Sequence, residues 1–309
     1  MARWPAFCVG LPVFSMKKMV LLAVLFVIST NLVAQERFSL FVGSDIEDVR
    51  RMLTVAGLKD NDVIYDLGSG DGRIVLEAAR LNLVLRGRGI EIDENLVRES
   101  NAAAKAEGYD ERVQFLHQDA FDADLKDATV ITMWLFPELM RLLRTKILAE
   151  ATPGTRVVTR IWDLGTWKAD YSEDSWPYVY MWVVPARAGG YWTWQLPFDG
   201  AQHTYSTVLE QDFQNVEGVV RVGNRRGVLE QMKLSGGQIS FNLTMTVGKH
   251  SPVQHAFSGR VNGDTMEGTV SVLHKPSEKP TVLPWRAVRA KESAYFAPTG
   301  IASKPSAVP

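Results

Sequence analysis

Cysteine is nearly absent from this 309-residue chain, in which Cys8 is the only one. A single cysteine excludes an intramolecular disulfide and any zinc site built from several cysteines. The five histidines are scattered, without the i, i+4 spacing of a helical metal pair: His117, His203, His250, His255 and His274. We therefore expect no metal site.

An excess of charge of one sign is also missing, since 34 lysines and arginines face 35 acids and leave a formal net charge of −1. This balance excludes a strongly basic protein that holds nucleic acid by charge alone, and we expect no nucleic-acid partner. The hydrophobic content of 46% is enough for a sizeable core in a chain of this length. Length and composition together predict two domains.

The N-terminal apolar run, Met19–Ile28, is too short to cross a bilayer as a helix. Two lysines precede it and a short polar stretch follows, which predicts a secretory signal peptide over residues 1–34, with Met16 as the true start. We expect an exported protein, periplasmic or secreted, or one that an uncleaved signal tethers close to the membrane. A cytoplasmic protein with an apolar N-terminus is the alternative.

Helical and strand patterns alternate from Asp45 to Ile161. The predicted strands are Val63–Leu67, Arg86–Ile92, Val113–His117, Thr129–Trp134 and Arg156–Ile161. Strict alternation implies a doubly wound parallel α/β sheet with right-handed crossovers. We predict that Tyr178–Val184 and Tyr191–Leu196 complete it as an antiparallel hairpin, which gives a first domain over residues 35–198.

The helical period disappears from about His203 onward. Short strand patterns separated by turn residues predict a small antiparallel β domain over residues 203–290, a meander or a lipocalin-like barrel. Two roles stay open for it: a capping or dimerising module, or a cup that selects the substrate. Residues 291–309 are predicted to be a flexible tail. The sequence predicts no oligomeric state.

The most informative stretch follows the first predicted strand. Asp66 ends the strand, and Gly68, Gly70 and Gly72 then stand at every second position before a predicted helix. Such glycines permit positive φ and a close approach of the backbone to a ligand, and the helix N-terminus offers unpaired N–H groups. The spacing differs from the dinucleotide pattern G-x-G-x-x-G, and no phosphate-loop Lys-Ser/Thr follows.

Four segments together resemble one enzyme family: D-L-G-S-G-D-G-R-I (66–74), G-I-E-I-D (89–93), T-M-W-L-F-P-E-L (132–139) and P-G-T-R-V-V (153–158). The first is similar to motif I of the class I S-adenosylmethionine (SAM)-dependent methyltransferases. The set, over about residues 40–197, is similar to a bacterial branch near the ATP-synthase c-subunit lysine methyltransferases. The N-P-P-Y segment of enzymes that modify amides and bases is absent. The resemblance implies a seven-stranded sheet and SAM as cofactor.

It also implies roles for single residues. Glu91, at the end of the second strand, would accept both ribose hydroxyls, and Asp119 would read the adenine amino group. Asp66 would pair with loop N–H groups and the methionine ammonium. The implied cofactor-binding residues are Asp66, Gly68, Ser69, Gly70, Gly72, Glu91 and Asp119.

For the acceptor side, Trp134 and Phe136 are candidates for an aromatic mouth, although ordinary core packing explains them equally well. No side chain is identified as a general base. We expect methyl transfer to a protein lysine. A small-molecule acceptor is one alternative, and an exported non-catalytic binding protein that uses the β domain is another.

Overall fold

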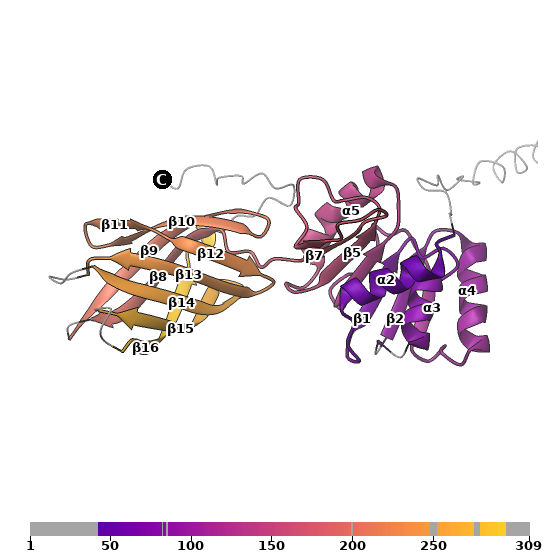
Figure 1. The fold of residues 1–309 in the computed structure, drawn as a ribbon, viewed down its shortest axis with the longest axis horizontal. Helices are drawn as coiled ribbons and strands as arrows, with labels where there is room; N and C mark the ends of the chain where they lie inside the picture. The colour runs from indigo at the N-terminus through magenta and orange to yellow at the C-terminus, as the bar shows by residue number, and fades with distance from the viewer. Residues whose placement is uncertain are drawn as a thin grey trace, which may run out of the picture. The chain divides into compact units, whose positions relative to one another are not determined.

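The structure, a computed structural model, describes residues 43–294 except 82, 85, 199, 248–251 and 275–278. The predicted signal peptide, Cys8, His250 and most of the predicted tail lie outside these residues. Within them the chain forms two separate β-sheets (Figure 1). No helix among the described residues is both long and apolar enough to cross a membrane.

The first sheet has seven strands in the order β3-β2-β1-β4-β5-β7-β6. Strands β1 to β5 run parallel, and β7 is antiparallel to both β5 and β6. This confirms the predicted doubly wound sheet. Its strands are β1 (Val63–Leu67), β2 (Arg86–Glu91), β3 (Val113–His117), β4 (Val130–Met133), β5 (Arg156–Arg160), β6 (Tyr171–Ser172) and β7 (Val179–Val183).

The helices of this domain begin and end at local signals. The Asp45 carboxylate accepts the Glu47 N–H at the start of α2, and Gly57 ends that helix with φ 56°. Asp93 caps α4 in the same way, and Pro137 opens α5. The helices are α2 (Ile46–Ala56), α3 (Arg73–Arg80), α4 (Glu94–Ala106) and α5 (Pro137–Glu150).

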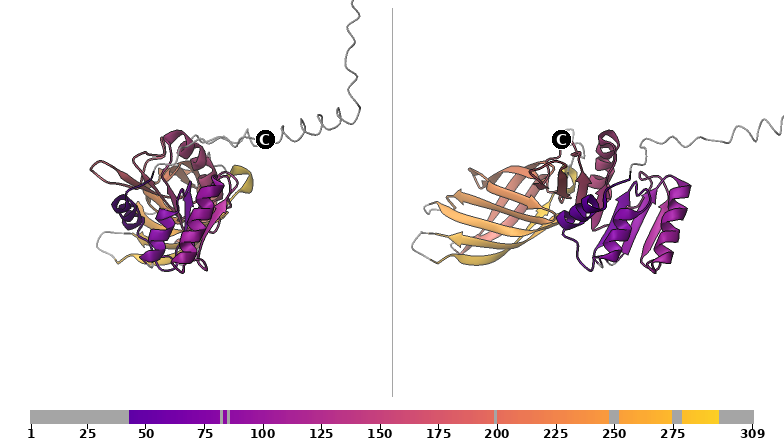
Figure 2. Two further views of the ribbon diagram at one scale, coloured as in Figure 1. Left: turned by 90° about the vertical axis from the view of Figure 1, so that its right-hand side faces the viewer. Right: turned by 45° about the vertical axis from the view of Figure 1, so that its right-hand side comes forward.

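The two faces of the first sheet are covered differently (Figure 2). Apolar residues of α2, α3 and α4 pack on one face, around Ile64 and Val158. On the other face the described residues supply one helix, α5, and loop side chains such as Leu125, Leu164 and Trp167 fill the remaining area. The loops after β3 and β5 are therefore part of the core.

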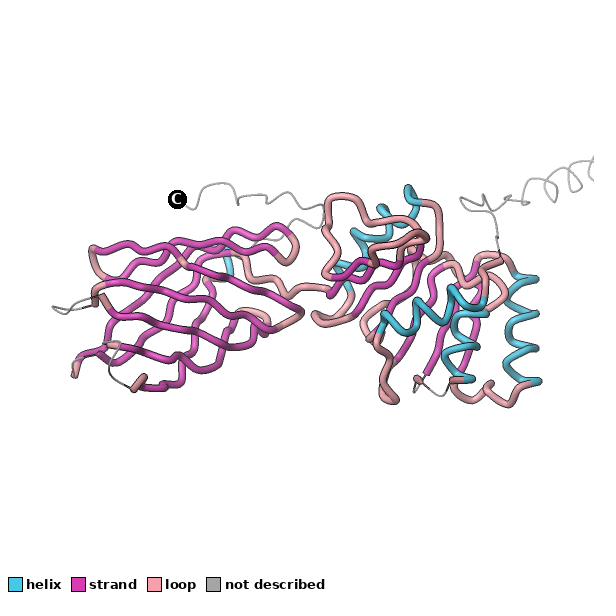
Figure 3. Tube along the Cα trace, in the orientation of Figure 1, coloured by secondary structure: helices cyan, strands magenta, loops and turns pink. Residues whose placement is uncertain are grey.

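The second sheet is an antiparallel, nearly closed barrel of nine strands (Figure 3). Each strand pairs with the next in the chain except β11 with β12, and β16 pairs back onto β8. Strands β10 and β12 approach each other across the remaining opening. The strands are β8 (Gly190–Phe198), β9 (Ala201–Asp212), β10 (Asn215–Val222), β11 (Arg225–Val228), β12 (Glu230–Ser235), β13 (Gln238–Met245), β14 (Val253–Asn262), β15 (Thr265–Leu273) and β16 (Thr281–Arg289); the short helix η1 (Lys291–Ser293) follows.

The barrel core contains a group of five packed aromatic rings among aliphatic side chains. Ring centroids of neighbouring members lie 4.6–6.5 Å apart. The five rings are Trp194, Tyr205, Phe241, Phe257 and Trp285. This packing confirms a small barrel and gives no support to a hollow cup.

The predicted hairpin of Tyr178–Val184 with Tyr191–Leu196 is wrong. Strand β7 completes the first sheet, whereas β8 pairs with β9 and β16 in the second. Every second residue of β8 is buried in the barrel core. A two-stranded hairpin would bury less of this apolar face. Gln211 holds the linker to β9, since its amide oxygen accepts the N–H groups of Ala188 (2.7 Å) and Gly189 (3.0 Å).

Candidate functional site

The predicted site residues meet at the carboxyl edge of the first sheet. Leu67 of β1 lies opposite Ile90 of β2 and Met133 of β4. The chain therefore leaves three neighbouring strands at one level, toward the glycine-rich turn on β1, Glu91 on β2 and Trp134 on β4. This is the edge at which ligands of open α/β sheets bind.

The glycine-rich turn, residues 68–72 and here called the Gly loop, has the predicted backbone. Gly68, Gly70 and Gly72 have φ values of 80°, 55° and 80°. A Cβ atom on Gly68 would lie 2.4 Å from Leu135 Cδ2, which no real contact allows. The positive φ favours glycine at this position, and a side chain there would also have to displace Leu135.

The Glu91 carboxylate is held by three main-chain donors. It accepts the N–H of Gly70 at 2.8 Å, of Ile92 at 2.8 Å and of Asp93 at 2.9 Å. Gly70 belongs to the Gly loop, so the carboxylate ties the end of β2 to that loop. A carboxylate with a fixed orientation beside the Gly loop suits a ligand with a pair of hydroxyl groups.

Asp66 is buried directly below the Gly loop, with 2% of its surface exposed. Its Oδ1 accepts the Thr132 hydroxyl at 2.7 Å. Burial raises the pKa of Asp66 to about 7, and the negative charges of Glu91 and Asp71 act in the same direction. A ligand ammonium beside this carboxylate would offset the cost of its burial.

The expected pairing of Asp66 with loop N–H groups is wrong. The N–H groups of Gly68 and Ser69 donate to the Ile90 carbonyl at 2.8 and 3.0 Å, and that of Gly70 donates to Glu91. The reason is geometric, because the Asp66 side chain points toward β4 while the loop folds over β2. The sequence shows two acids near the loop but not which one each N–H group reaches.

Asp119 is half-buried just beyond β3. Its Oδ1 accepts the Phe121 N–H at 2.9 Å, and the neighbouring Gln118 N–H donates to the Glu91 carbonyl at 3.0 Å. The structure therefore places Asp119 next to Glu91 along the edge, where the two acids were expected to act on one nucleoside.

The two candidate mouth aromatics differ in their surroundings. Trp134 is half-buried against the core on the α2–α4 face, and the Arg160 guanidinium lies 6.0 Å from its ring centroid. Phe136 precedes α5 and is 46% exposed. Core packing therefore accounts for Trp134, while Phe136 remains available to an acceptor.

Three residues of this edge escaped the sequence analysis. Thr132 is the hydrogen-bond partner of Asp66, Leu135 covers Gly68, and fully buried Arg160 forms ion pairs with Asp48 and Glu173. Thr132 and Leu135 stand inside the recognised 132–139 segment, but their contacts depend on the pairing of β1 with β4. No pattern in the sequence signals the burial of Arg160.

The described residues fit SAM. The Gly loop has three glycines at positive φ, and the Ser69 hydroxyl is buried without a partner in the structure. Acids stand at the ends of three adjacent strands, and SAM carries an ammonium group, a ribose diol and an adenine amino group for acids to bind. The residues that would hold it are Asp66, Gly68, Ser69, Gly70, Gly72, Glu91 and Asp119.

Comparison with known proteins agrees with this geometry. Residues 66–171 match the family model of the ANTKMT methyltransferase domain. A protein-lysine N-methyltransferase of Saccharolobus islandicus is 38% identical over 119 residues, which are 38% of this chain and 74% of the archaeal protein. The chain belongs to this methyltransferase family. It is a class I SAM-dependent methyltransferase, with SAM as the methyl donor.

Other relatives of this methyltransferase differ in coverage. The adenine nucleotide translocase lysine N-methyltransferase of Mus musculus is 32% identical over 41% of this chain and 55% of the mouse protein. The chain thus spans about half the length of that relative. A solved structure titled an RNA methyltransferase from Salinibacter ruber, in complex with S-adenosyl-L-homocysteine, is 40% identical over 52% of this chain and 99% of that one, with a TM-score of 0.46.

Proposed function

We propose that this enzyme methylates the side-chain amine of a protein lysine. One observation carries the proposal: the 38% identity over 74% of the archaeal protein-lysine N-methyltransferase. The segment after β4, which reads Trp-Leu-Phe-Pro at 134–137 in place of N-P-P-Y, agrees with an amine acceptor. A small-molecule amine is the enzymatic alternative.

Methyl transfer from SAM depends on the orientation of donor and acceptor more than on acid–base catalysis by the protein. SAM supplies a methyl group on a positively charged sulfur. With SAM bound, the neutral lysine nitrogen would form the new C–N bond with its lone pair, while the C–S bond would break in line and sulfur would keep the electron pair. The proton that the acceptor loses goes to water. Asp66, the Gly loop and Glu91 would hold and orient the donor, and the residues beyond β4 and β5 would exclude water.

The acceptor amine must be neutral before it reacts, although a free lysine has a pKa of about 10.4. Apolar surroundings disfavour the ammonium form and lower that pKa. Exposed Phe136 and half-buried Leu135, next to the Gly loop, offer such surroundings. No described side chain at this edge is needed as a base.

The test is a labelled-methyl transfer screen with the full chain, preceded by calorimetry with SAM. We expect SAM binding and label that amino-acid analysis recovers as methyl-lysine in protein. Label only in a small-molecule fraction would favour the alternative acceptor, and label in RNA would replace the lysine proposal. Binding of SAM without any transfer would favour a non-catalytic binding protein.

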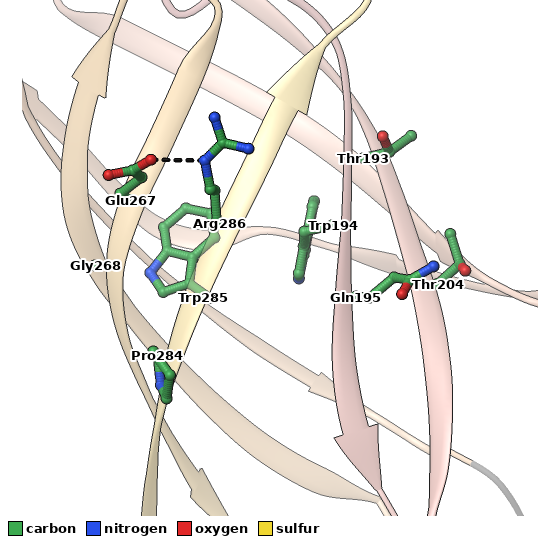
Figure 4. A pocket seen from close by; sticks show the side chains of 9 residues that line it. All are labelled: Thr193, Trp194, Gln195, Thr204, Glu267, Gly268, Pro284, Trp285 and Arg286. Atoms are coloured by element: carbon green, nitrogen blue, oxygen red, sulfur yellow. Dashed lines mark hydrogen bonds and ion pairs between the residues drawn. The ribbon is translucent and has the colours of Figure 1, made fainter.

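The β domain offers a surface groove rather than a hollow interior. Strands β8 and β16 pair only from Trp192–Arg289 to Trp194–Ala287, and a groove lies between them (Figure 4). Trp194 and Trp285 line it, and they belong to the packed core of the barrel. Because side chains fill the described part of the barrel interior, we propose the capping or dimerising role for the β domain, in preference to substrate selection.

For the location of the enzyme we propose export, or attachment to the membrane through an uncleaved signal, on the basis of residues 1–34. An exported enzyme would be separated from the SAM made in the cytoplasm. An enzyme tethered by an uncleaved signal, with its catalytic domain in the cytoplasm, would keep access to SAM. Cell fractionation with mass spectrometry of the N-terminus distinguishes these states. A mature N-terminus near Gln35 in the periplasm or medium is the exported outcome, and intact Met1 or Met16 on freely soluble cytoplasmic protein would overturn both.

A further inference from the structure

Exposed aromatic side chains gather at the carboxyl edge of the first sheet. In the described part of this domain the large aromatics with high exposure are Phe121, Phe136, Trp162, Tyr171 and Trp176. All but Tyr171 lie in edge loops: after β3, β4 and β5, and before the antiparallel strand β7. Exposed apolar surface concentrated at one place marks an interaction site.

One of these residues, Trp162, directly follows a strained turn. Ile161 follows β5 with φ 71°, a conformation that β-branched residues rarely adopt. The Trp162 N–H donates to the Arg160 carbonyl at 2.8 Å, so Ile161 is the centre of a γ-turn. The Ile161 N–H in turn donates to the Tyr178 carbonyl at 2.8 Å. Strain of this kind persists where surrounding contacts enforce it, and it is concentrated at functional sites.

A row of rings begins at exposed Trp176 and runs along β7. Trp176 and Tyr178 have centroids 5.7 Å apart in an edge-to-face arrangement, and Tyr178 and Tyr180 are 5.9 Å apart. Tyr180 packs in the same apolar cluster as Leu135, the residue that covers Gly68. The row therefore flanks the carboxyl edge, with β5 and β4 between it and β1.

An acid and a base lie beside this row, since the Asp163 carboxylate is 3.9 Å from the Arg141 guanidinium. Desolvation, followed by the charge of Asp163 and by Tyr178, raises the pKa of the Tyr180 hydroxyl, which places Asp163 near that ring. Asp163 is 52% exposed, and its Oδ1 accepts the Gly165 N–H at 2.9 Å. Because Asp163 is already paired with Arg141, the attraction for a cationic side chain comes from the aromatic faces.

We propose that Phe136, Trp162, Trp176, Tyr178 and Tyr180 form the entrance for a lysine that is flanked by apolar residues. This inference rests on the proposed lysine acceptor. Aromatic faces bind the incoming ammonium group, and the apolar row then favours its neutral form. The exposed rings bind the flanking apolar residues, which makes the entrance selective for sequence context as well as for lysine.

The experiment uses two synthetic peptides, each with one central lysine, flanked by leucines in one and by glutamates in the other. Binding is followed by tryptophan fluorescence with S-adenosyl-L-homocysteine present, and methylation by labelled SAM. We expect the leucine-flanked peptide to bind and react about tenfold better. Tyr178→Ala should lower its kcat/KM about tenfold, mainly through KM, with the SAM affinity within twofold of the parent.

Two control variants distinguish the loss of the Tyr178 ring from a general loss of structure. Tyr178→Phe keeps the aromatic face and should stay within threefold of the parent, while Tyr191→Ala removes an exposed ring from β8 and should change nothing. Equal use of both peptides, or a Tyr178→Ala variant that matches the parent, would overturn the entrance. Failure of the parent to bind either peptide would also overturn it. A screen in which no protein lysine is labelled would instead overturn the proposed function.

Discussion

Thr132 donates a 2.7 Å hydrogen bond to the Asp66 carboxylate, which is buried beneath the Gly loop. The two residues lie opposite each other on β1 and β4. The contact keeps a desolvated acid in place at the point where the ligand ammonium is expected. It also makes Asp66 the clearest source of pH dependence in the site.

Asp66 should make the parent less stable as the pH rises from about 4 to about 7. Its pKa is 3.8 for an ordinary Asp and about 7 in the fold, so the folded state binds more protons between those values. Stability is then fully present below pH 4 and is lost as the pH rises through 7. Asp66→Asn should remove this slope in melting temperature and weaken SAM binding tenfold or more. A parallel slope in parent and variant would contradict the burial of a titrating Asp66.

Thr132→Val should destabilise the protein by about 1–3 kcal/mol, because it leaves the buried acid without its donor. Denaturant unfolding at pH 7 measures this loss. In the Asp66→Asn background the same substitution should cost less, since a neutral amide is less expensive to leave unpaired. Equal costs in both backgrounds would show that the hydrogen bond to the carboxylate is not the reason.

Glu91→Ala should weaken SAM binding about ten- to a hundred-fold, since charge-assisted hydrogen bonds of about 1.5–3 kcal/mol are lost. It should also lower the melting temperature modestly, because the N–H groups of Gly70, Ile92 and Asp93 lose their acceptor. Glu91→Gln, which keeps one acceptor oxygen, should fall between. Calorimetry beside thermal unfolding separates the two effects, and unchanged SAM affinity in Glu91→Ala would disprove the ribose role.

Gly68→Ala should lower both stability and SAM affinity, since its Cβ would meet Leu135 and its φ of 80° is strained for alanine by about 1–2 kcal/mol. Adding Leu135→Ala removes the clash but not the strain. The double variant should therefore recover part of the affinity. Full recovery, or none, in a calorimetric titration would show that only one of the two effects operates.

Arg160→Met should destabilise the protein by about 3–5 kcal/mol, because Arg160 is fully buried between Asp48 and Glu173. Loss of this side chain leaves Asp48 and Glu173 with Arg51 as their shared ion-pair partner. Adding Glu173→Gln should restore part of the stability by removing one charge. Chemical denaturation gives the free energies of unfolding, and a single variant as stable as the parent would contradict the buried network.

The elements that are determined by residues close together in the sequence were predictable. Period 2 and period 3.6 patterns located β1 to β5 and their helices, and the regular strand pattern after His203 located most of the barrel. The hairpin at Tyr178–Leu196 failed because period 2 says that a segment is a strand but not which sheet it joins. Strand β8 pairs with the next strand, β9, and with β16, which lies almost a hundred residues further on.

The sequence by itself determined the Gly loop and the acids after β1, β2 and β3, because glycine spacing and strand ends are local properties. The resemblance of these segments to class I methyltransferases then predicted methyl transfer from SAM. Only the tertiary structure decided that Glu91 rather than Asp66 holds the Gly70 N–H, that Thr132 partners Asp66, and that Tyr178 joins the edge beside Ile161. Each of these contacts joins residues brought together by strand register, which depends on packing of the whole sheet rather than on any one segment.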